Sequence, residues 1–235
     1  MRKDRIHSEI PKGYYARRLS NGHNGTCYLT DFGMVYKEYP CEYIYLKELE
    51  YLSHHKSDFV AFPEEFVFQN IEGKNSLRGY LMKYIDGITL EDLSEATKIR
   101  EFINALNIFE KEMLRLTTEG IIFTDLNQRN LLYTKDGLIK AVDTDLYDIT
   151  YDDDFRRLYS ENLKELAATI ISQFIGVRSF QNSRMNDLVR NCGAYGKIRS
   201  SNLLEGLTDE AQKETKEEIE TIGEFKKTLH MLKNN

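Results

Sequence analysis

The sequence predicts an α+β protein whose strands come mostly in the first third of the chain and whose long helices follow. Two apolar or alternating runs, residues 28–39 and 66–84, are interrupted by Gly, Asn and Asp, which is typical of strands and turns. Apolar residues recur at helical spacing from Phe102 to Leu116, which predicts a long, buried helix over 99–119. At 235 residues, the chain can form one large domain or two small lobes.

Composition and charge narrow the class of protein. The formal net charge is −6 and no dense run of Lys or Arg occurs, which argues against a nucleic-acid partner. No apolar run reaches the length of a membrane span, and the N-terminus lacks the apolar stretch of a secretory signal. Cys27, Cys41 and Cys192 lie far apart, which predicts a reducing compartment without a disulfide or zinc framework. We therefore expect a cytoplasmic protein with no membrane partner.

A glycine-containing turn precedes the first clear strand. Residues 19–27 are rich in Asn and Gly, and Gly22 and Gly25 would let backbone amides come close to a ligand. The strand that follows alternates with period two, so Val35 and Lys37 share one of its faces. The sequence thus places a lysine on a strand directly after a candidate phosphate-binding turn.

The most informative stretch combines polar side chains with a hairpin. Two short apolar runs are separated by Asp136-Gly137, a strong hairpin-turn signal. Asp125, Asn130 and Asp143 then fall at the ends of the paired strands, where rigid elements can bring them to one cation. Carboxylate and amide oxygens suit magnesium, which also binds phosphate oxygens.

Taken in order, these features resemble the protein-kinase-like phosphotransferases. The turn at 19–27 resembles the kinase glycine-rich loop, and the strand with Lys37 resembles the one that carries the phosphate-binding lysine. Asp125 and Asn130 resemble the catalytic loop, and Asp143 resembles the metal-binding aspartate that follows it. Several moderate signals in the same order are stronger evidence than any one of them.

The resemblance spans residues 14–175 and implies a two-lobed fold. It predicts a small N-terminal lobe over 1–84, made of an antiparallel β-sheet and one helix. A larger, mostly helical C-terminal lobe would occupy 85–235. Together they would form a single protein-kinase-like domain over 1–235.

The resemblance also implies an ATP site and a role for each of its residues. A glutamate on the helix expected over 41–54 would pair with Lys37, and Glu48 is preferred because it shares a face with Ile44 and Leu52. Glutamates 42 and 50 are alternatives. The residues expected around the nucleotide are Leu19, Gly22, Gly25, Cys27, Val35, Lys37, Met82 and Leu132, with the backbone of Lys83 and Tyr84.

For the chemical step, the resemblance implies that Asp125 orients the acceptor hydroxyl. Magnesium would be held by Asn130 and Asp143. Asp145 would offer a second carboxylate to the metal or to its surroundings, or would simply tolerate the turn conformation.

Several departures from the kinase pattern affect the expected regulation and acceptor. Thr124 replaces the arginine that forms charge-assisted hydrogen bonds with a phosphorylated activation loop. Phosphorylation over 146–160 is therefore not expected to raise turnover. Asn127 replaces a lysine, Thr144 and Asp145 replace a Phe-Gly pair, and no Ala-Pro-Glu motif follows. The short acidic segment leaves little room for a peptide platform.

These observations predict an ATP- and Mg²⁺-dependent phosphotransferase that acts on a hydroxyl group. An atypical Ser/Thr protein kinase is the preferred interpretation, and a small-molecule kinase of the aminoglycoside or sugar type is the first alternative. A pseudokinase that binds nucleotide without transferring phosphate is the second, because of the departures above.

Overall fold

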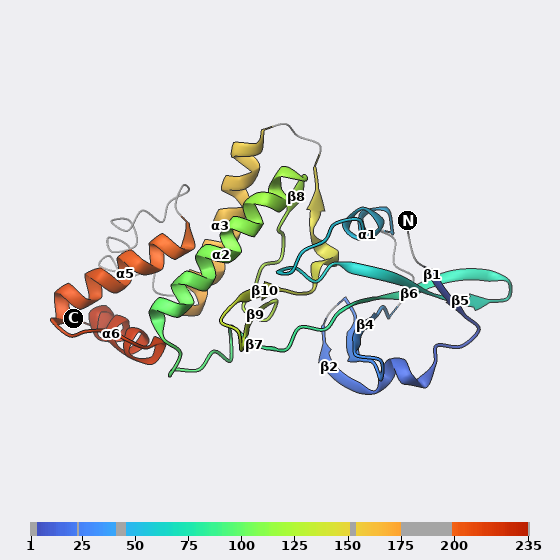
Figure 1. Cartoon of the computed structure of the whole chain (residues 1–235), viewed down its shortest axis with the longest axis horizontal. Coiled ribbons are helices and arrows are strands. Elements are labelled where there is room, and N and C mark those ends of the chain that lie inside the picture. The colour runs from blue at the N-terminus through green and yellow to red at the C-terminus, as the bar shows by residue number, and fades with distance from the viewer. Residues whose placement is uncertain (1–3, 23, 41–45, 151–153, 175–198, 235) are drawn as a thin grey trace. The chain divides into compact units, whose positions relative to one another are not determined.

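The computed structural model describes residues 4–22, 24–40, 46–150, 154–174 and 199–234. The chain divides into two compact units, Met1–Ile85 with Val142–Asp145, and Asp86–Ala141 with Leu146–Asn235. The first unit is built around a sheet and the second is mostly helical (Figure 1). This distribution confirms the predicted α+β fold.

The first unit contains a six-stranded sheet in the order β1-β5-β6-β4-β3-β2. Its strands are β1 (Asp4–His7), β2 (Arg17–Asn21), β3 (Thr26–Leu29), β4 (Met34–Glu38), β5 (Pro63–Ile71) and β6 (Lys74–Lys83). The unit also contains a 3-10 turn, η1 (Lys12–Tyr15), and one short helix, α1 (Leu46–Leu52). The sheet was expected to be antiparallel throughout, but β1 runs parallel to β5, so the sheet is mixed.

The central strand β4 is buried on both faces. Val35 belongs to an apolar cluster that contains Leu49 of α1 and Phe66 of β5. Tyr36 points the other way and packs with Tyr14 among other residues. Because side chains alternate along a strand, Lys37 lies on the same face as Val35. A lysine is thereby carried into the interior of this unit.

The second unit packs helices around short hairpins. Its elements are β7 (Gly87–Thr89), α2 (Ile99–Thr118), β8 (Ile121–Ile122), β9 (Leu131–Thr134), β10 (Ile139–Ala141), β11 (Asp148–Ile149), α3 (Phe155–Phe174), α5 (Ser200–Thr215) and α6 (Ile222–Asn234). A 3-10 turn, η2 (Thr144–Leu146), lies where the chain passes from the first unit to the second. Helices α2 and α3 lie side by side, and α5 packs against α2 and α6 (Figure 1).

Local signals gave the predicted hairpin and the predicted long helix correctly. β9 and β10 pair antiparallel, and the turn between them has Gly137 at a φ of 72°. That left-handed conformation favours glycine, as the Asp-Gly signal requires. Helix α2 ends before Gly120, which has a φ of 82°.

Two helix ends are fixed by caps, one made by a side chain and one by the backbone. Helix α3 begins at Phe155, where the Asp154 carboxylate accepts a hydrogen bond from the Arg157 amide. Helix α5 ends just before Lys216, which adopts a left-handed conformation and donates its backbone amide to the Gln212 carbonyl.

A buried carboxylate joins α2 to α5. Glu110 is fully buried and accepts hydrogen bonds from the Ser201 amide, at 3.1 Å, and from its hydroxyl, at 2.6 Å. Burial raises the pKa of Glu110, although the hydrogen bonds from Ser201 oppose that shift. The folded protein therefore favours the protonated carboxyl, and this contribution to stability is lost as the pH rises through the folded-state pKa.

We expect Glu110→Gln to remove this pH dependence, because an amide cannot ionise. The free energy of unfolding of the variant relative to the wild type should increase from pH 5 to pH 8 in urea titrations. Glu101→Gln, which changes an exposed glutamate on the same helix, should show no such trend. A difference between variant and wild type that stays constant with pH would contradict the expectation.

Among the helices described, none is both long and apolar enough to cross a membrane.

Candidate active site

In the first unit, Lys37 is the centre of a buried ion-pair cluster. Its side chain is 2% exposed, and Nζ forms ion pairs with Asp143 and Asp145, the latter at 2.7 Å. The Tyr39 hydroxyl donates to the other Asp145 oxygen at 3.2 Å. Lys37 on β4 and Tyr39, just after this strand, therefore contact a pair of carboxylates that lies more than 100 residues later in the chain.

The two carboxylates of this cluster stabilise the charged form of Lys37. Burial opposes a charged ammonium, but the negative charges of Asp145 and Asp143, with their hydrogen bonds, hold the pKa of Lys37 above its ordinary value. The lysine is therefore protonated at neutral pH. A protonated ammonium is the form that attracts phosphate oxygens.

The Asp-Thr-Asp segment is held by a hydrogen bond from its central threonine. Thr144 is fully buried, and its hydroxyl donates to the Ala61 carbonyl at 3.2 Å. Asp143 has a φ of 62°, a left-handed conformation that few residues other than Gly, Asn and Asp adopt readily. The threonine thus anchors the turn that aims both carboxylates at Lys37.

The predicted glycine turn lies beside this cluster. The Gly22 amide donates to the Gly25 carbonyl at 2.9 Å, which closes the turn between β2 and β3. A Cβ on Gly25 would lie 2.5 Å from the Glu38 carbonyl oxygen and 3.4 Å from Cε of Lys37. A side chain at position 25 would therefore prevent the turn from approaching the strand that carries Lys37. His23, in the same turn, is outside the described residues.

The candidate adenine residues of the first unit differ in burial. Val35 and Met82 are buried register partners on β4 and β6, and Cys27 packs against the same cluster. Burial raises the pKa of the Cys27 thiol, which behaves as a small apolar side chain. Leu19 is exposed on β2.

The predicted hinge residues lie at the end of β6, with Lys83 its last residue and Tyr84 directly after it. Lys83 is exposed and Tyr84 is partly buried against the apolar cluster of Val35. Leu132 belongs to the second unit, on β9, where it is half-buried.

Glu48 does not reach the lysine. It lies on α1 as an exposed residue, whereas Leu49 and Leu52 are the buried residues of this helix. The structure gives Lys37 a different pair of partners, Asp143 and Asp145, from the glutamate expected on sequence grounds. Ile44, on which the choice of Glu48 partly depended, is outside the described residues.

In the second unit, two amides fix the carboxylate of Asp125. Nδ2 of Asn130 donates to one carboxylate oxygen at 3.1 Å, and Nδ2 of Asn127 donates to the other at the same distance. Asn130 also donates to the Asp125 carbonyl at 3.0 Å. Asp125 has a φ of 57° and is exposed, so its carboxylate is held in place yet accessible to a ligand.

Two buried polar residues on α3 support this loop, and sequence reasoning missed both. Oδ1 of Asn162 accepts a hydrogen bond from the Phe123 amide at 2.8 Å, and the hydroxyl of Thr169 donates to the Leu126 carbonyl. The two residues that they contact, Phe123 and Leu126, lie on either side of Asp125 in the sequence. The available signal was weak, since it consisted of two polar residues seven positions apart on an otherwise apolar helix face.

The family model of the ABC1 atypical kinase-like domain matches residues 34–173, which is more than half of the chain. The chain belongs to the ABC1 atypical kinase-like family. The resemblance to the protein-kinase-like superfamily is thereby confirmed. No curated protein matches the chain significantly.

The ABC1 match includes Lys37, Asp125, Asn130, Asp143 and Asp145, and it begins after the glycine turn. Asp143 of the first unit and Asn130 of the second each carry hard oxygen atoms, the type of donor that magnesium prefers. The side chain of Asp143 is 34% exposed, so one carboxylate of the lysine cluster remains accessible.

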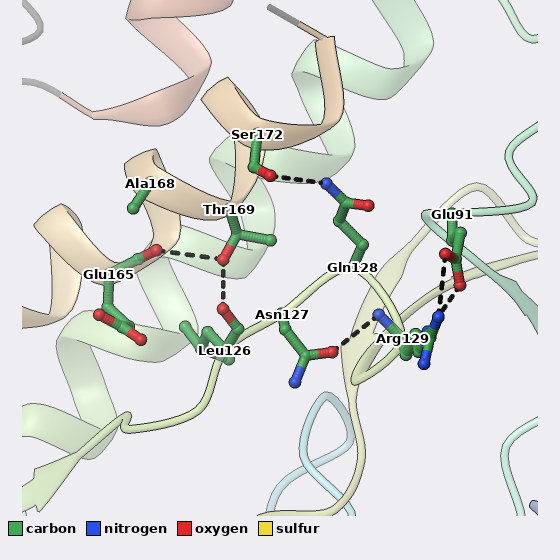
Figure 2. A pocket seen from close by; sticks show the side chains of 9 residues that line it. All are labelled: Glu91, Leu126, Asn127, Gln128, Arg129, Glu165, Ala168, Thr169 and Ser172. Atoms are coloured by element: carbon green, nitrogen blue, oxygen red, sulfur yellow. Dashed lines mark hydrogen bonds and ion pairs between the residues drawn. The ribbon is translucent and has the colours of Figure 1, made fainter. Parts of the chain in front are cut away.

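A cavity of about 530 Å³ adjoins the loop after Asp125 in this ABC1 chain. Figure 2 shows the loop facing α3 across it, with Gln128 bonded to Ser172 and Arg129 paired with Glu91 at its edge. Its lining residues are Glu91, Leu126, Asn127, Gln128, Arg129, Glu165, Ala168, Thr169 and Ser172. Burial, followed by the charge of Asp125, raises the pKa of Glu165.

Proposed function

We propose that this chain is an ATP- and Mg²⁺-dependent phosphotransferase that moves the γ-phosphate to a hydroxyl acceptor. The observation that carries the proposal is the pairing of buried Lys37 with Asp143 and Asp145 in a member of a kinase-like family. The accessible carboxylate of Asp125, fixed by two amides, supports the same conclusion. Phosphoryl transfer depends mainly on positioning and charge stabilisation, which are what these residues supply.

Nucleotide binding would use the first unit chiefly. The Gly22 and Gly25 turn would cover the phosphates, and the Lys37 ammonium would bind them. The residues in contact with adenine would be Leu19, Cys27, Val35, Met82 and Leu132, with hydrogen bonds from the backbone of Lys83 and Tyr84. Asn130 and Asp143 would hold magnesium, which neutralises phosphate charge when bound.

In the chemical step, Asp125 would accept the proton of the acceptor hydroxyl. The acceptor oxygen then forms a bond to the γ-phosphorus as the bond to the bridging oxygen of ADP breaks. Only an ionised carboxylate can accept this proton. Both oxygens of Asp125 accept amide hydrogen bonds, which hold the carboxylate in one orientation.

The acceptor class has two candidates. The order of the kinase motifs favours a protein Ser/Thr hydroxyl, in line with an atypical protein kinase. The cavity beside the Asp125 loop favours a small hydroxyl compound instead, because Glu165 brings a carboxylate near that of Asp125. Such a surrounding would stabilise an acceptor that carries a positive charge.

Transfer of label from [γ-³²P]ATP and Mg²⁺ into host extract, separated into protein and small-molecule fractions, tests the proposal. The wild type should label one fraction, and Lys37→Met should label neither. The labelled fraction decides the acceptor class. Nucleotide binding by the wild type without transfer to either fraction would contradict the proposal and favour a pseudokinase.

A further inference from the structure

The two carboxylates that pair with Lys37 differ in accessibility. The Asp145 side chain is 1% exposed, against 34% for Asp143. Both oxygens of Asp145 are engaged within the unit, one by Lys37 at 2.7 Å and one by the Tyr39 hydroxyl at 3.2 Å. Asp145 is therefore directed inward, whereas Asp143 has surface left for a ligand.

Burying an ammonium group costs free energy of folding unless a carboxylate stays paired with it. If Asp143 binds a metal ion, the ion pair between Asp143 and Lys37 weakens, because the metal and the ammonium compete for the carboxylate oxygens of Asp143. Asp145 would still pair with the lysine, since its other oxygen accepts a hydrogen bond from Tyr39, which directly follows the strand that carries Lys37. Glu48 is an exposed residue of α1.

We propose that Asp145 is the positioning residue for Lys37 and that Asp143 alone of the two carboxylates binds magnesium. The proposal rests on the proposed phosphotransferase function and replaces the metal role expected for Asp145. It also assigns to Asp145 the pairing role that was expected of a helix glutamate. The phosphate-binding lysine is then set by β4 and the Asp-Thr-Asp turn, without a contribution from α1.

Nucleotide affinity measured with and without Mg²⁺ separates the two roles. Titration of the full chain with ATP, followed by calorimetry, gives a dissociation constant for each condition. Asp145→Asn should weaken binding by about tenfold in both conditions, because a charged hydrogen bond to the phosphate-binding lysine is lost. Asp143→Asn should leave Mg²⁺-free binding nearly intact and remove the gain in affinity that Mg²⁺ gives.

Two further variants complete the comparison. Glu48→Gln tests the helix glutamate directly, and Glu64→Gln is the matched control because Glu64 is exposed on the same unit. The control should match the wild type in both conditions. An equal loss of affinity in Glu48→Gln and Asp145→Asn would overturn the proposal. Loss of the Mg²⁺ effect in Asp145→Asn would overturn it as well.

A stability measurement keeps the inference testable if the wild type binds no nucleotide, an outcome that would contradict the proposed function alone. Thermal unfolding of Lys37→Met, Asp145→Asn and the double variant forms a cycle that needs no ligand. The shift in melting temperature for the double variant should be smaller than the sum of the single shifts. Additive shifts would show that the two side chains are not coupled and would overturn the pairing.

Discussion

Replacing Asp125 with asparagine is expected to lower the phosphotransfer rate by about 10²- to 10⁴-fold, the range that general-base catalysis contributes. The amide keeps nearly the shape of the carboxylate but cannot accept the proton of the acceptor hydroxyl. Asparagine also tolerates the left-handed backbone at this position, where φ is 57°. The loss should therefore be chemical rather than structural.

Single-turnover transfer of label from ATP measures this effect, and ATP titration shows whether binding survives. Asp148→Asn is the matched control, because Asp148 is an exposed aspartate of the same unit. The control should transfer at the wild-type rate. Retention of more than about a tenth of the wild-type rate in Asp125→Asn would contradict the role of Asp125 as the base.

Replacing Asn162 with alanine is expected to lower the free energy of unfolding by about 3 kcal/mol, since buried polar partners would be left unsatisfied. Asn162 is fully buried, and its oxygen accepts from the Phe123 amide. Its Nδ2 donates to the Thr117 hydroxyl at 2.8 Å and to the Ile121 carbonyl at 3.1 Å. One side chain thus connects α3 to the end of α2 and to the strand that leads into the Asp125 loop.

Urea unfolding provides this measurement, with one m value (the slope of the free energy of unfolding against urea concentration) fitted to all variants. Asn202→Ala changes an exposed asparagine on α5 and should alter stability by no more than about 0.5 kcal/mol. A similar small effect for Asn162→Ala would show that water or a shift of the backbone satisfies the three groups. The assigned role of Asn162 would then be incorrect.

The elements that the sequence predicted well are those that depend on neighbouring residues. The β9–β10 hairpin follows from an Asp-Gly turn between two apolar runs, and α2 follows from a sustained helical period. The loop from Asp125 to Asn130 was also recognisable, because its polar residues are close together in the sequence. Such local signals can be recognised in the sequence without knowledge of the rest of the fold.

The partner of Lys37 could not be predicted in the same way. Helical spacing favoured Glu48, whereas the structure pairs the lysine with Asp145, 108 positions later in the chain. The choice depends on a buried turn fixed by the Thr144 hydroxyl, a contact that no local pattern records. Asn162 was missed for the same reason, since its partners lie about 40 residues away.

The parallel pairing of β1 with β5 affects how far the chain can be shortened. β5 is nine residues long, and β1 covers its outer side along Phe66 to Gln69. A chain that began after His7 would leave the N–H and C=O groups of that side open to water. Open strand edges pair readily with the edges of other molecules. β1 therefore replaces part of this long edge with an edge strand of only four residues, and short edge strands offer less surface for pairing with other molecules.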